Sequence, residues 1–246
     1  MAHEFSKQAK LYAQYRPTYP DEMYRFIFER MQAMEVAWDC GTGSGQVAVY
    51  LAARFKHVFA TDIDKEQLKH AFQKPNITYK NAPAEDSGLP ANYFDLITVA
   101  QAIHWFDFEK FYHEVRRVAK DQALLAAISY GMLQIREDID PILNELYREA
   151  FGSYFSEVRQ YIDQRYQTIP FPFEEIPSPL FKSTFSWTLD HLEGFLNSWS
   201  PVQKIKTAAN YNPVDPIIKR VRKLIPGDEK ISVSFPVFMR LGRIKK

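Results

Sequence analysis

The sequence predicts an α/β fold, a seven-stranded and mostly parallel sheet with helices on both faces and an antiparallel strand near the C-terminus. From residue 36 onward, short apolar runs alternate with segments of helical spacing, which is typical of parallel strands joined by right-handed crossovers. The 246 residues, 46% hydrophobic and 25% charged, are ordinary for one globular domain with a buried core. We therefore expect residues 1–246 to form a single domain.

A helical cap is expected over residues 1–33, ahead of the sheet. One helix precedes the segment 16–20, Arg-Pro-Thr-Tyr-Pro, and a second is predicted from Asp21 to about Met34. Asp21 follows a proline and is placed to act as the N-cap of the second helix. The apolar positions of this helix are Tyr24, Phe26, Ile27 and Met31.

The core of the domain is predicted over residues 34–130. Apolar runs predict strands at 36–40, 57–61, 76–80, 94–100 and 123–128. Segments with helical spacing predict helices at 46–55, 65–72 and 108–119. Strands and helices of these lengths favour a parallel sheet covered on both faces.

The alternation changes after residue 130. A helix is predicted over 138–155, a proline-rich stretch follows, and we expect the segment 131–175 to form a helical lid. The remainder, 176–246, is expected to complete the sheet. Its strands are predicted at 181–189 and 231–241, and its helices near 190–198 and 213–225.

The charge balance of the chain is close to neutral, with 31 basic and 30 acidic residues. Proteins that bind nucleic acid through phosphates usually carry a clear basic excess, so a nucleic-acid partner is not expected. The basic stretches at 219–223 and 243–246 are explained by a solvated helix face and a trailing end.

Cellular location is predicted from what the chain lacks. Cys40 is its single cysteine, so no internal disulfide can form and a reducing compartment is expected. No apolar stretch has the length of a signal peptide or of the roughly 20 residues that cross a membrane. These observations predict a cytoplasmic protein without a membrane partner.

The segment 39–46, Asp-Cys-Gly-Thr-Gly-Ser-Gly-Gln, lies between a predicted strand and a predicted helix. Alternating glycines allow the backbone to turn sharply and to approach a ligand closely, and the helix N-terminus offers free amides. The dinucleotide-binding pattern requires glycine where Gln46 stands. The segment therefore indicates a nucleotide-type ligand without specifying a dinucleotide.

Asp62 ends the second predicted strand, about 20 residues after the glycines. An acidic residue at this place accepts hydrogen bonds from ribose hydroxyls. The alternative role, capping of the following helix, suits Asp64 better. The spacing favours a ribose contact for Asp62.

Five separated motifs together resemble the class I methyltransferases that depend on S-adenosyl-L-methionine (SAM), of the type 11 group. They are the glycine segment 39–46, Asp62, the segment 84–86, the segment 100–106 and the segment 15–20. The similarity extends to the small-molecule branch that includes trans-aconitate-type enzymes, and it covers roughly residues 10–130 in the same order. It implies a Rossmann-like fold and SAM as the cofactor.

The resemblance also implies roles toward SAM. The bend that follows Asp39, with Gly41, Thr42 and Gly43, would hold the methionine part, and Asp62 the ribose. Ile63 would pack on the adenine, with Ala84 and Glu85 at its edge. Gln101 would lie near the amino-acid end, which Tyr15 and Arg16 would cover.

Methyl transfer from a sulfonium uses an activated donor, so positioning and exclusion of water can supply most of the rate. A carboxylate acceptor needs no base, whereas a hydroxyl or an amine does. His104 is the candidate base, and a pocket-wall role is the alternative. The candidate acceptor-pocket residues are His104, Trp105, Tyr130 and Trp199.

The leading hypothesis is O-methylation of a small carboxylic acid. Two alternatives stay open: a SAM-binding sensor or partner subunit without catalysis, and a methyltransferase that acts on RNA or protein. No metal site is predicted, because no Cys/His cluster occurs and no second histidine follows His113 and Glu114 at zinc-protease spacing. The acceptor's identity and the oligomeric state are not predicted.

Overall fold

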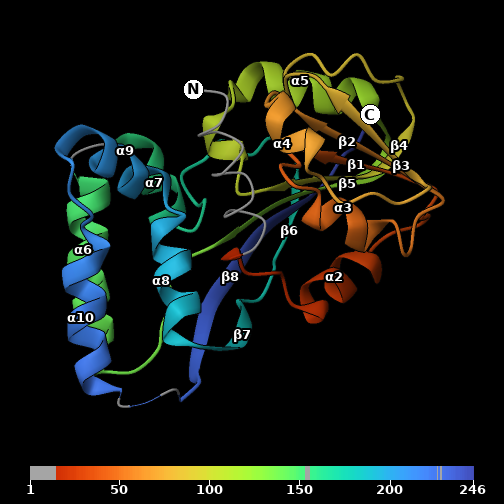
Figure 1. Ribbon diagram of the computed structural model, residues 1–246. Coiled ribbons are helices and arrows are strands. Elements are labelled where there is room, and N and C mark those ends of the chain that lie inside the picture. The colour runs from red at the N-terminus through yellow and green to blue at the C-terminus, as the bar shows by residue number, and fades with distance from the viewer. Residues whose placement is uncertain (1–14, 153–155, 226, 228) are drawn as a thin grey trace. The chain divides into compact units, whose positions relative to one another are not determined.

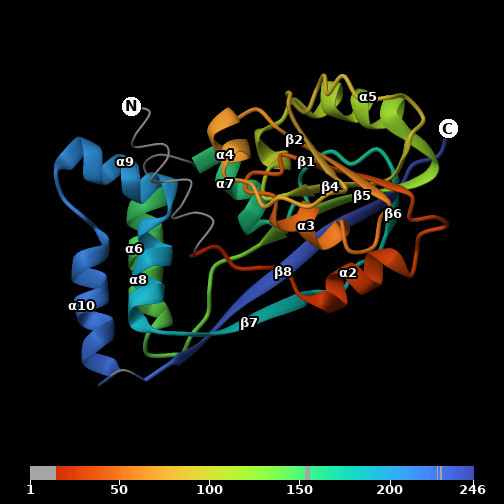
Figure 2. The ribbon, with the colours of Figure 1, turned by 45° about the vertical axis from the view of Figure 1, so that its right-hand side comes forward.

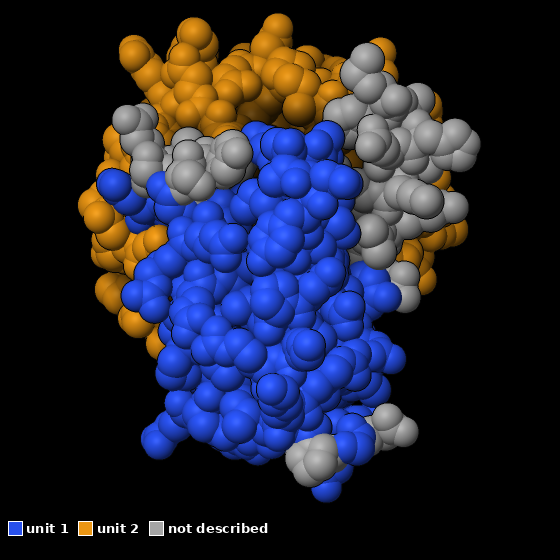
Figure 3. Space-filling view, turned by 60° about the vertical axis from the view of Figure 1, so that its left-hand side comes forward, with its two compact units in different colours: residues 1–17, 132–160, 182–236 blue, residues 18–131, 161–181, 237–246 orange. Residues whose placement is uncertain are grey.

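The computed structural model describes residues 15–152, 156–225, 227 and 229–246, and its contacts divide the chain into two compact units. The sheet unit comprises residues 18–131, 161–181 and 237–246. The helical unit comprises residues 1–17, 132–160 and 182–236 (Figure 3). Each unit is described here by itself.

The sheet has eight strands in the order β3-β2-β1-β4-β5-β8-β6, and β7 pairs with β8 (Figure 1). The strands are β1 (Val36–Cys40), β2 (His57–Asp62), β3 (Ile77–Asn81), β4 (Phe94–Ala100), β5 (Ala119–Tyr130), β6 (Glu174–Ile176), β7 (Phe181–Trp187) and β8 (Ile231–Arg243). The first five pair in parallel, and β8 runs antiparallel to β5. The predicted mostly parallel sheet with an antiparallel C-terminal strand is confirmed, with one strand more than expected.

Strand β1 lies at the centre of the parallel part and is buried along its whole length. Its Trp38 is fully buried, and the indole N–H donates to Thr61 Oγ1 of β2 at 2.9 Å. In the register, Cys40 lies opposite Thr61 on one side and opposite Val99 of β4 on the other. The carboxyl ends of three strands therefore meet at one edge, where parallel sheets place their ligands.

Helices cover both faces of the sheet: α5 lies on one face, and α2 and α3 lie on the other (Figures 1 and 2). The helices of the sheet unit are α2 (Asp21–Phe28), α3 (Gln46–Leu51), α4 (Lys65–Lys69), the 3-10 turn η1 (Ile103–Trp105) and α5 (Phe108–Val118). Helix α5 buries Phe111, Val115 and Val118 along one side, as its apolar spacing requires.

Helix α2 differs from its prediction at both ends. Its N-cap position is Pro20, and no side chain caps the helix. Asp21 is the first helical residue, and its carboxylate accepts a hydrogen bond from the hydroxyl of Tyr50 on α3 instead. The helix ends at Phe28, before the Met34 expected from the apolar spacing. The helix predicted before Arg16 lies outside the described residues.

Helices form most of the helical unit: α6 (Asp140–Gly152), α8 (Leu189–Asn197), α9 (Ser200–Ala209) and α10 (Val214–Leu224). Helices α9 and α10 both contact α6 and α8. The residues of α7 (Ser156–Asp163) are divided between the two units, as are those of the predicted lid, 131–175. Its role as a lid stays a prediction. Within the described ranges, no helix combines the length and hydropathy that a membrane crossing requires.

Candidate active site

The chain bends sharply between β1 and α3, and glycine is required there for two reasons. Gly41 and Gly43 have φ angles of +66° and +54°, in the left-handed region that side chains disfavour. A Cβ at Gly41 would lie only 2.6 Å from the Cβ of Ala102, so no side chain fits between the bend and the segment after β4. Glycine therefore lets the bend pack closely against the segment after β4, at the carboxyl edge of the sheet.

Asp39 holds this bend from beneath. Its carboxylate accepts hydrogen bonds from Thr42 Oγ1 at 2.5 Å, Thr98 Oγ1 at 2.8 Å and the amide of Ala48 at 3.1 Å. The side chain is buried, and this burial raises its pKa to about 6 although all three hydrogen bonds favour the ionised form. Asp39 thus ties the bend, the next strand and α3 together. Direct contacts of Asp39 and Thr42 with a cofactor stay predictions.

Asp62 joins the bend to the end of β2. One carboxylate oxygen accepts the N–H of Gly43 at 2.7 Å, and the other accepts the N–H of Asp64 at 2.8 Å. Burial raises the pKa of Asp62, and the backbone amides of Asp64, Gly43 and Ile63 oppose that shift. A carboxylate has about four acceptor sites, so acceptor capacity remains for a ligand. The carboxylate and the glycine bend are therefore neighbours, as their spacing predicts.

The residues predicted around the adenine differ in exposure. Ile63 directly follows Asp62 and is 77% exposed, which is unusual for a large apolar side chain and leaves one of its faces open to a flat ring. Ala84 is buried. Glu85 accepts the N–H of Asp107 at 2.9 Å, next to the start of α5, and this links the segment after β3 to the segment that carries His104.

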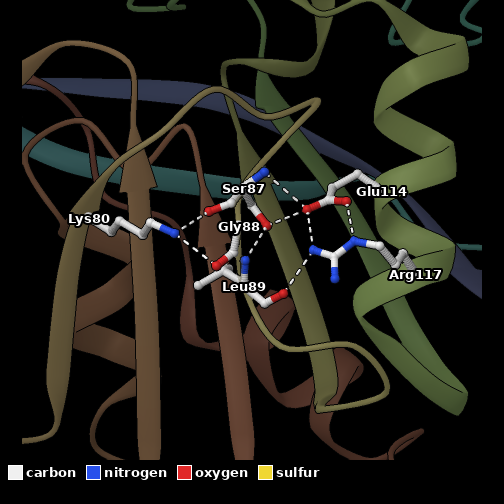
Figure 4. Close-up of polar contacts among 6 residues, drawn as sticks. All are labelled: Lys80, Ser87, Gly88, Leu89, Glu114 and Arg117. Carbon is white, nitrogen blue, oxygen red and sulfur yellow. Dashed lines mark hydrogen bonds and ion pairs between the residues drawn. The ribbon is translucent and has the colours of Figure 1, made fainter.

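The segment that bears Ala84 and Glu85 is held by a buried carboxylate on α5 (Figure 4). Glu114 accepts hydrogen bonds from the amide and the hydroxyl of Ser87, at 3.0 and 2.5 Å. Arg117 donates two hydrogen bonds of 2.7 Å to the same carboxylate. Burial raises the pKa of Glu114, but the hydrogen bonds from Arg117 and Ser87 outweigh it and the net pKa is lowered.

Two cations hold the backbone of the same segment. Arg117 also donates to the carbonyl of Leu89 at 2.8 Å. Lys80, on β3, donates to the carbonyls of Ser87 and Gly88 at 2.7 and 2.9 Å (Figure 4). The segment therefore has little freedom, although it lacks regular secondary structure. The sequence analysis did not assign these side chains, because their partners are backbone atoms that no motif marks.

Gln101 follows β4 with a φ angle of +56°, a conformation that non-glycine residues rarely adopt. Its side chain is held at both ends: Ser129 Oγ donates to the amide oxygen at 3.0 Å, and the amide nitrogen donates to the carbonyl of Tyr130 at 3.3 Å. Such strain is commonly kept at functional positions. Tyr130 itself is buried, and its ring lies 6.1 Å from that of Tyr19.

His104 lies in η1 and is 8% exposed. Its Nδ1 is 2.9 Å from the hydroxyl of Tyr166, a residue of the irregular segment after α7. The neighbouring Trp105 is 58% exposed, so a partly exposed indole lies beside a buried imidazole. Sequence analysis missed Tyr166, since it lies 62 residues from His104 without a motif of its own.

Three of the predicted residues belong to the helical unit and gather around α8. The ring of Tyr15 meets that of His191 edge-on at 5.0 Å between centroids. The guanidinium of Arg16 lies 5.8 Å from the centre of the Phe195 ring. Trp199 is buried, with its ring 5.8 Å from that of Phe195. The other predicted residues belong to the sheet unit.

The residues of the sheet unit fit the adenosyl cofactor by two tests. The glycine bend presents backbone without side chains, and a carboxylate with spare acceptor capacity adjoins it. In addition, the side-chain oxygen of Gln67, beside Gly43, is buried without a hydrogen-bond partner among the described residues. Among those residues, no cluster of His, Cys, Asp and Glu could hold a metal ion.

The comparisons with known proteins find methyltransferases. A family described as a methyltransferase domain matches residues 38–127. A Dictyostelium discoideum protein, named a candidate methyltransferase, is 34% identical over 98% of this chain and 94% of its own length. A Saccharomyces cerevisiae protein, named for SAM-dependent methyl transfer, is 25% identical over 77% of each chain.

A solved structure from Anaeromyxobacter dehalogenans, described as a candidate type II methyltransferase, is also similar. It is 35% identical, has a TM-score of 0.85 and covers 94% of this chain and 98% of its own. The fold and the site define a class I methyltransferase. The chain belongs to the methyltransferase family, and its cofactor is SAM.

Proposed function

We propose that the protein transfers the methyl group of SAM to a carboxylate oxygen of a small carboxylic acid. The observation that carries this proposal is the environment of His104. Its ring is buried and its Nδ1 lies 2.9 Å from the Tyr166 hydroxyl, so the imidazole is fixed in place, which supports a role in the pocket wall. A carboxylic acid has an ordinary pKa near 4, so it is already ionised at neutral pH and needs no base.

The cofactor side of the proposal assigns each residue a part. Asp62 binds the ribose hydroxyls, and Ile63 packs on the adenine, whose edge meets Ala84 and Glu85. The backbone of Gly41 and Gly43, with Asp39 and Thr42 beneath it, faces the methionine part. Gln101, Tyr15 and Arg16 hold the amino-acid end. Support comes from the glycine bend, from the spare acceptor sites of Asp62 and from the exposed face of Ile63.

Bound SAM supplies a methyl group on a positively charged sulfur, which leaves the protein the tasks of orientation and water exclusion. Trp105 offers an exposed aromatic face to the acceptor. Tyr166 fixes the orientation of the His104 ring, which forms part of the pocket wall. Tyr130 and Trp199 complete the proposed acceptor contacts. Arg16 is the cation assigned to the carboxylate at the amino-acid end of SAM.

Calorimetry with the demethylated cofactor S-adenosylhomocysteine tests the cofactor side. We expect a dissociation constant in the micromolar range. An absence of heat with S-adenosylhomocysteine, together with binding of NADH, would overturn the cofactor assignment.

Transfer of a labelled methyl group tests the acceptor. The protein is incubated with methyl-labelled SAM and with panels of small carboxylic acids, phenols and amines. A methyl ester releases its label as methanol in dilute alkali, whereas methyl ethers and N-methyl products keep it. We expect an alkali-labile product from the acid panel. Stable products from amines or phenols, or competition by tRNA, would overturn the carboxylate proposal while leaving the cofactor assignment intact.

A further inference from the structure

Helix α4 begins at Lys65, shortly after Asp62, the residue predicted to bind the ribose. It carries Gln67, a side chain that the sequence analysis did not assign. Asp64 caps the helix, accepting the amides of Glu66 at 2.8 Å and Gln67 at 3.3 Å. Helical side chains lean toward the N-terminus of their helix. Gln67 therefore reaches back toward Asp62 and the glycine bend.

The amide oxygen of Gln67 is buried and has no hydrogen-bond partner among the described residues. It lies next to the α-carbon of Gly43: a Cβ built there would lie 3.2 Å from it. Buried side-chain oxygens without a partner are rare, and each needs an explanation. A ligand that brings a hydrogen-bond donor to this oxygen is one such explanation.

Gly43 lies between two acceptors. Its N–H donates to one carboxylate oxygen of Asp62 at 2.7 Å, and its α-carbon faces the amide oxygen of Gln67. The Asp62 carboxylate keeps unused lone pairs, and the Gln67 oxygen keeps both of its own. Two neighbouring acceptors complement a ligand with two neighbouring donors. A ribose, with hydroxyls on adjacent carbons, presents such a pair.

We propose that Gln67 is a ribose-binding residue, which accepts a hydrogen bond from one ribose hydroxyl while Asp62 accepts from the other. The inference rests on the proposed placement of the SAM ribose at Asp62. It makes the pair a specificity determinant, because a nucleoside that lacks one hydroxyl leaves a buried oxygen without a donor.

Gln67→Met tests the proposal, since methionine keeps the length of the side chain and removes the acceptor. We expect S-adenosylhomocysteine to bind about 2- to 12-fold more weakly, the range for one neutral hydrogen bond. The matched control is Gln160→Met, the same substitution at an exposed position of α7, which should leave affinity unchanged.

The midpoint of thermal unfolding distinguishes a ligand-binding role of Gln67 from a purely structural one. In the ligand-free protein the Gln67 oxygen has no hydrogen bond to lose, so its removal should leave the midpoint of thermal unfolding unchanged or raised. A structural glutamine would instead lower that midpoint when replaced. The expected result is weaker binding together with undiminished stability.

Deoxy analogues identify the donor. Calorimetry with 2′-deoxy and 3′-deoxy S-adenosylhomocysteine should show that both bind the unaltered protein more weakly. For one of the two, Gln67→Met should cause no further loss, because the hydrogen bond is already absent. An equal further loss for both analogues would mean that the oxygen faces another donor, and would overturn the proposal.

The outcomes separate this inference from the function on which it rests. If the unaltered protein binds no S-adenosylhomocysteine, the proposed function itself fails. If Asp62→Ala abolishes binding while Gln67→Met binds normally, the ribose site stands and only the role of Gln67 is refuted.

Discussion

Replacement of Asp62 by alanine tests the centre of the site. The carboxylate already holds the amides of Gly43 and Asp64 at 2.7 and 2.8 Å, and its remaining lone pairs are the proposed ribose acceptors. A hydrogen bond to a charged acceptor contributes about 1.5–3 kcal/mol. If Asp62→Ala costs one such contribution, affinity for S-adenosylhomocysteine should fall roughly 12- to 160-fold. The bend should also loosen, because the Gly43 amide loses its partner.

Isothermal titration of Asp62→Ala with S-adenosylhomocysteine measures this loss, and circular dichroism establishes that the variant is folded. The matched control is Asp64→Asn, which removes a nearby charge while an asparagine still caps α4. That control should bind within about threefold of the unaltered protein, because the Asp64 charge is only partly buried and is screened by solvent. A folded Asp62→Ala variant with unchanged affinity would exclude the carboxylate from the site.

Three further predictions concern the support of the site. Glu114→Ala should lower the free energy of unfolding by about 2–4 kcal/mol, because the buried amide and hydroxyl of Ser87 lose their acceptor. Urea denaturation measures this loss, and the control Glu109→Ala, on the exposed side of α5, should change the free energy of unfolding little. Gly41→Ala should lower the free energy of unfolding by at least about 2 kcal/mol, because of the left-handed φ and the contact with Ala102. Gly152→Ala, where a Cβ would meet nothing within 4 Å, should be neutral or stabilising in the same assay. Burial raises the pKa of Asp39 from 3.8 to about 6, so the protonated form is favoured in the folded protein and ionisation costs stability. The contribution of Asp39 should therefore fall by about 3 kcal/mol as pH rises from below 3.8 to above 6. Asp39→Asn should lack this fall when urea curves are compared at the two ends of that range, and parallel pH profiles would refute the assignment.

The central part of the fold could be predicted because its signals are local. Strand β1 is a short apolar run, and the bend that follows it is marked by glycines with positive φ. Asp62 ends the next strand, and Asp64 caps α4 as its position suggested. Each of these features depends on residues within a few positions of one another, so a single sequence is enough to predict them.

The elements that were missed lack such signals. Strand β6 has three residues, two of them exposed glutamates, so it shows no apolar alternation. Helix α9 has no side-chain cap, and its buried residues are Pro201 and Val202 near its start. The apolar spacing that extended α2 to Met34 continues past the point where the helix stops, because spacing alone does not mark an end.

The two halves of the site differ in how far sequence can define them. The predicted cofactor residues Asp39 and Asp62 lie near the ends of two neighbouring strands, where the pairing of β1 with β2 brings them together. His104 instead owes its orientation to Tyr166, from an irregular segment that no periodicity predicts. An acceptor's identity depends on contacts of this second kind. Related methyltransferases can therefore keep one cofactor site while their acceptors diverge.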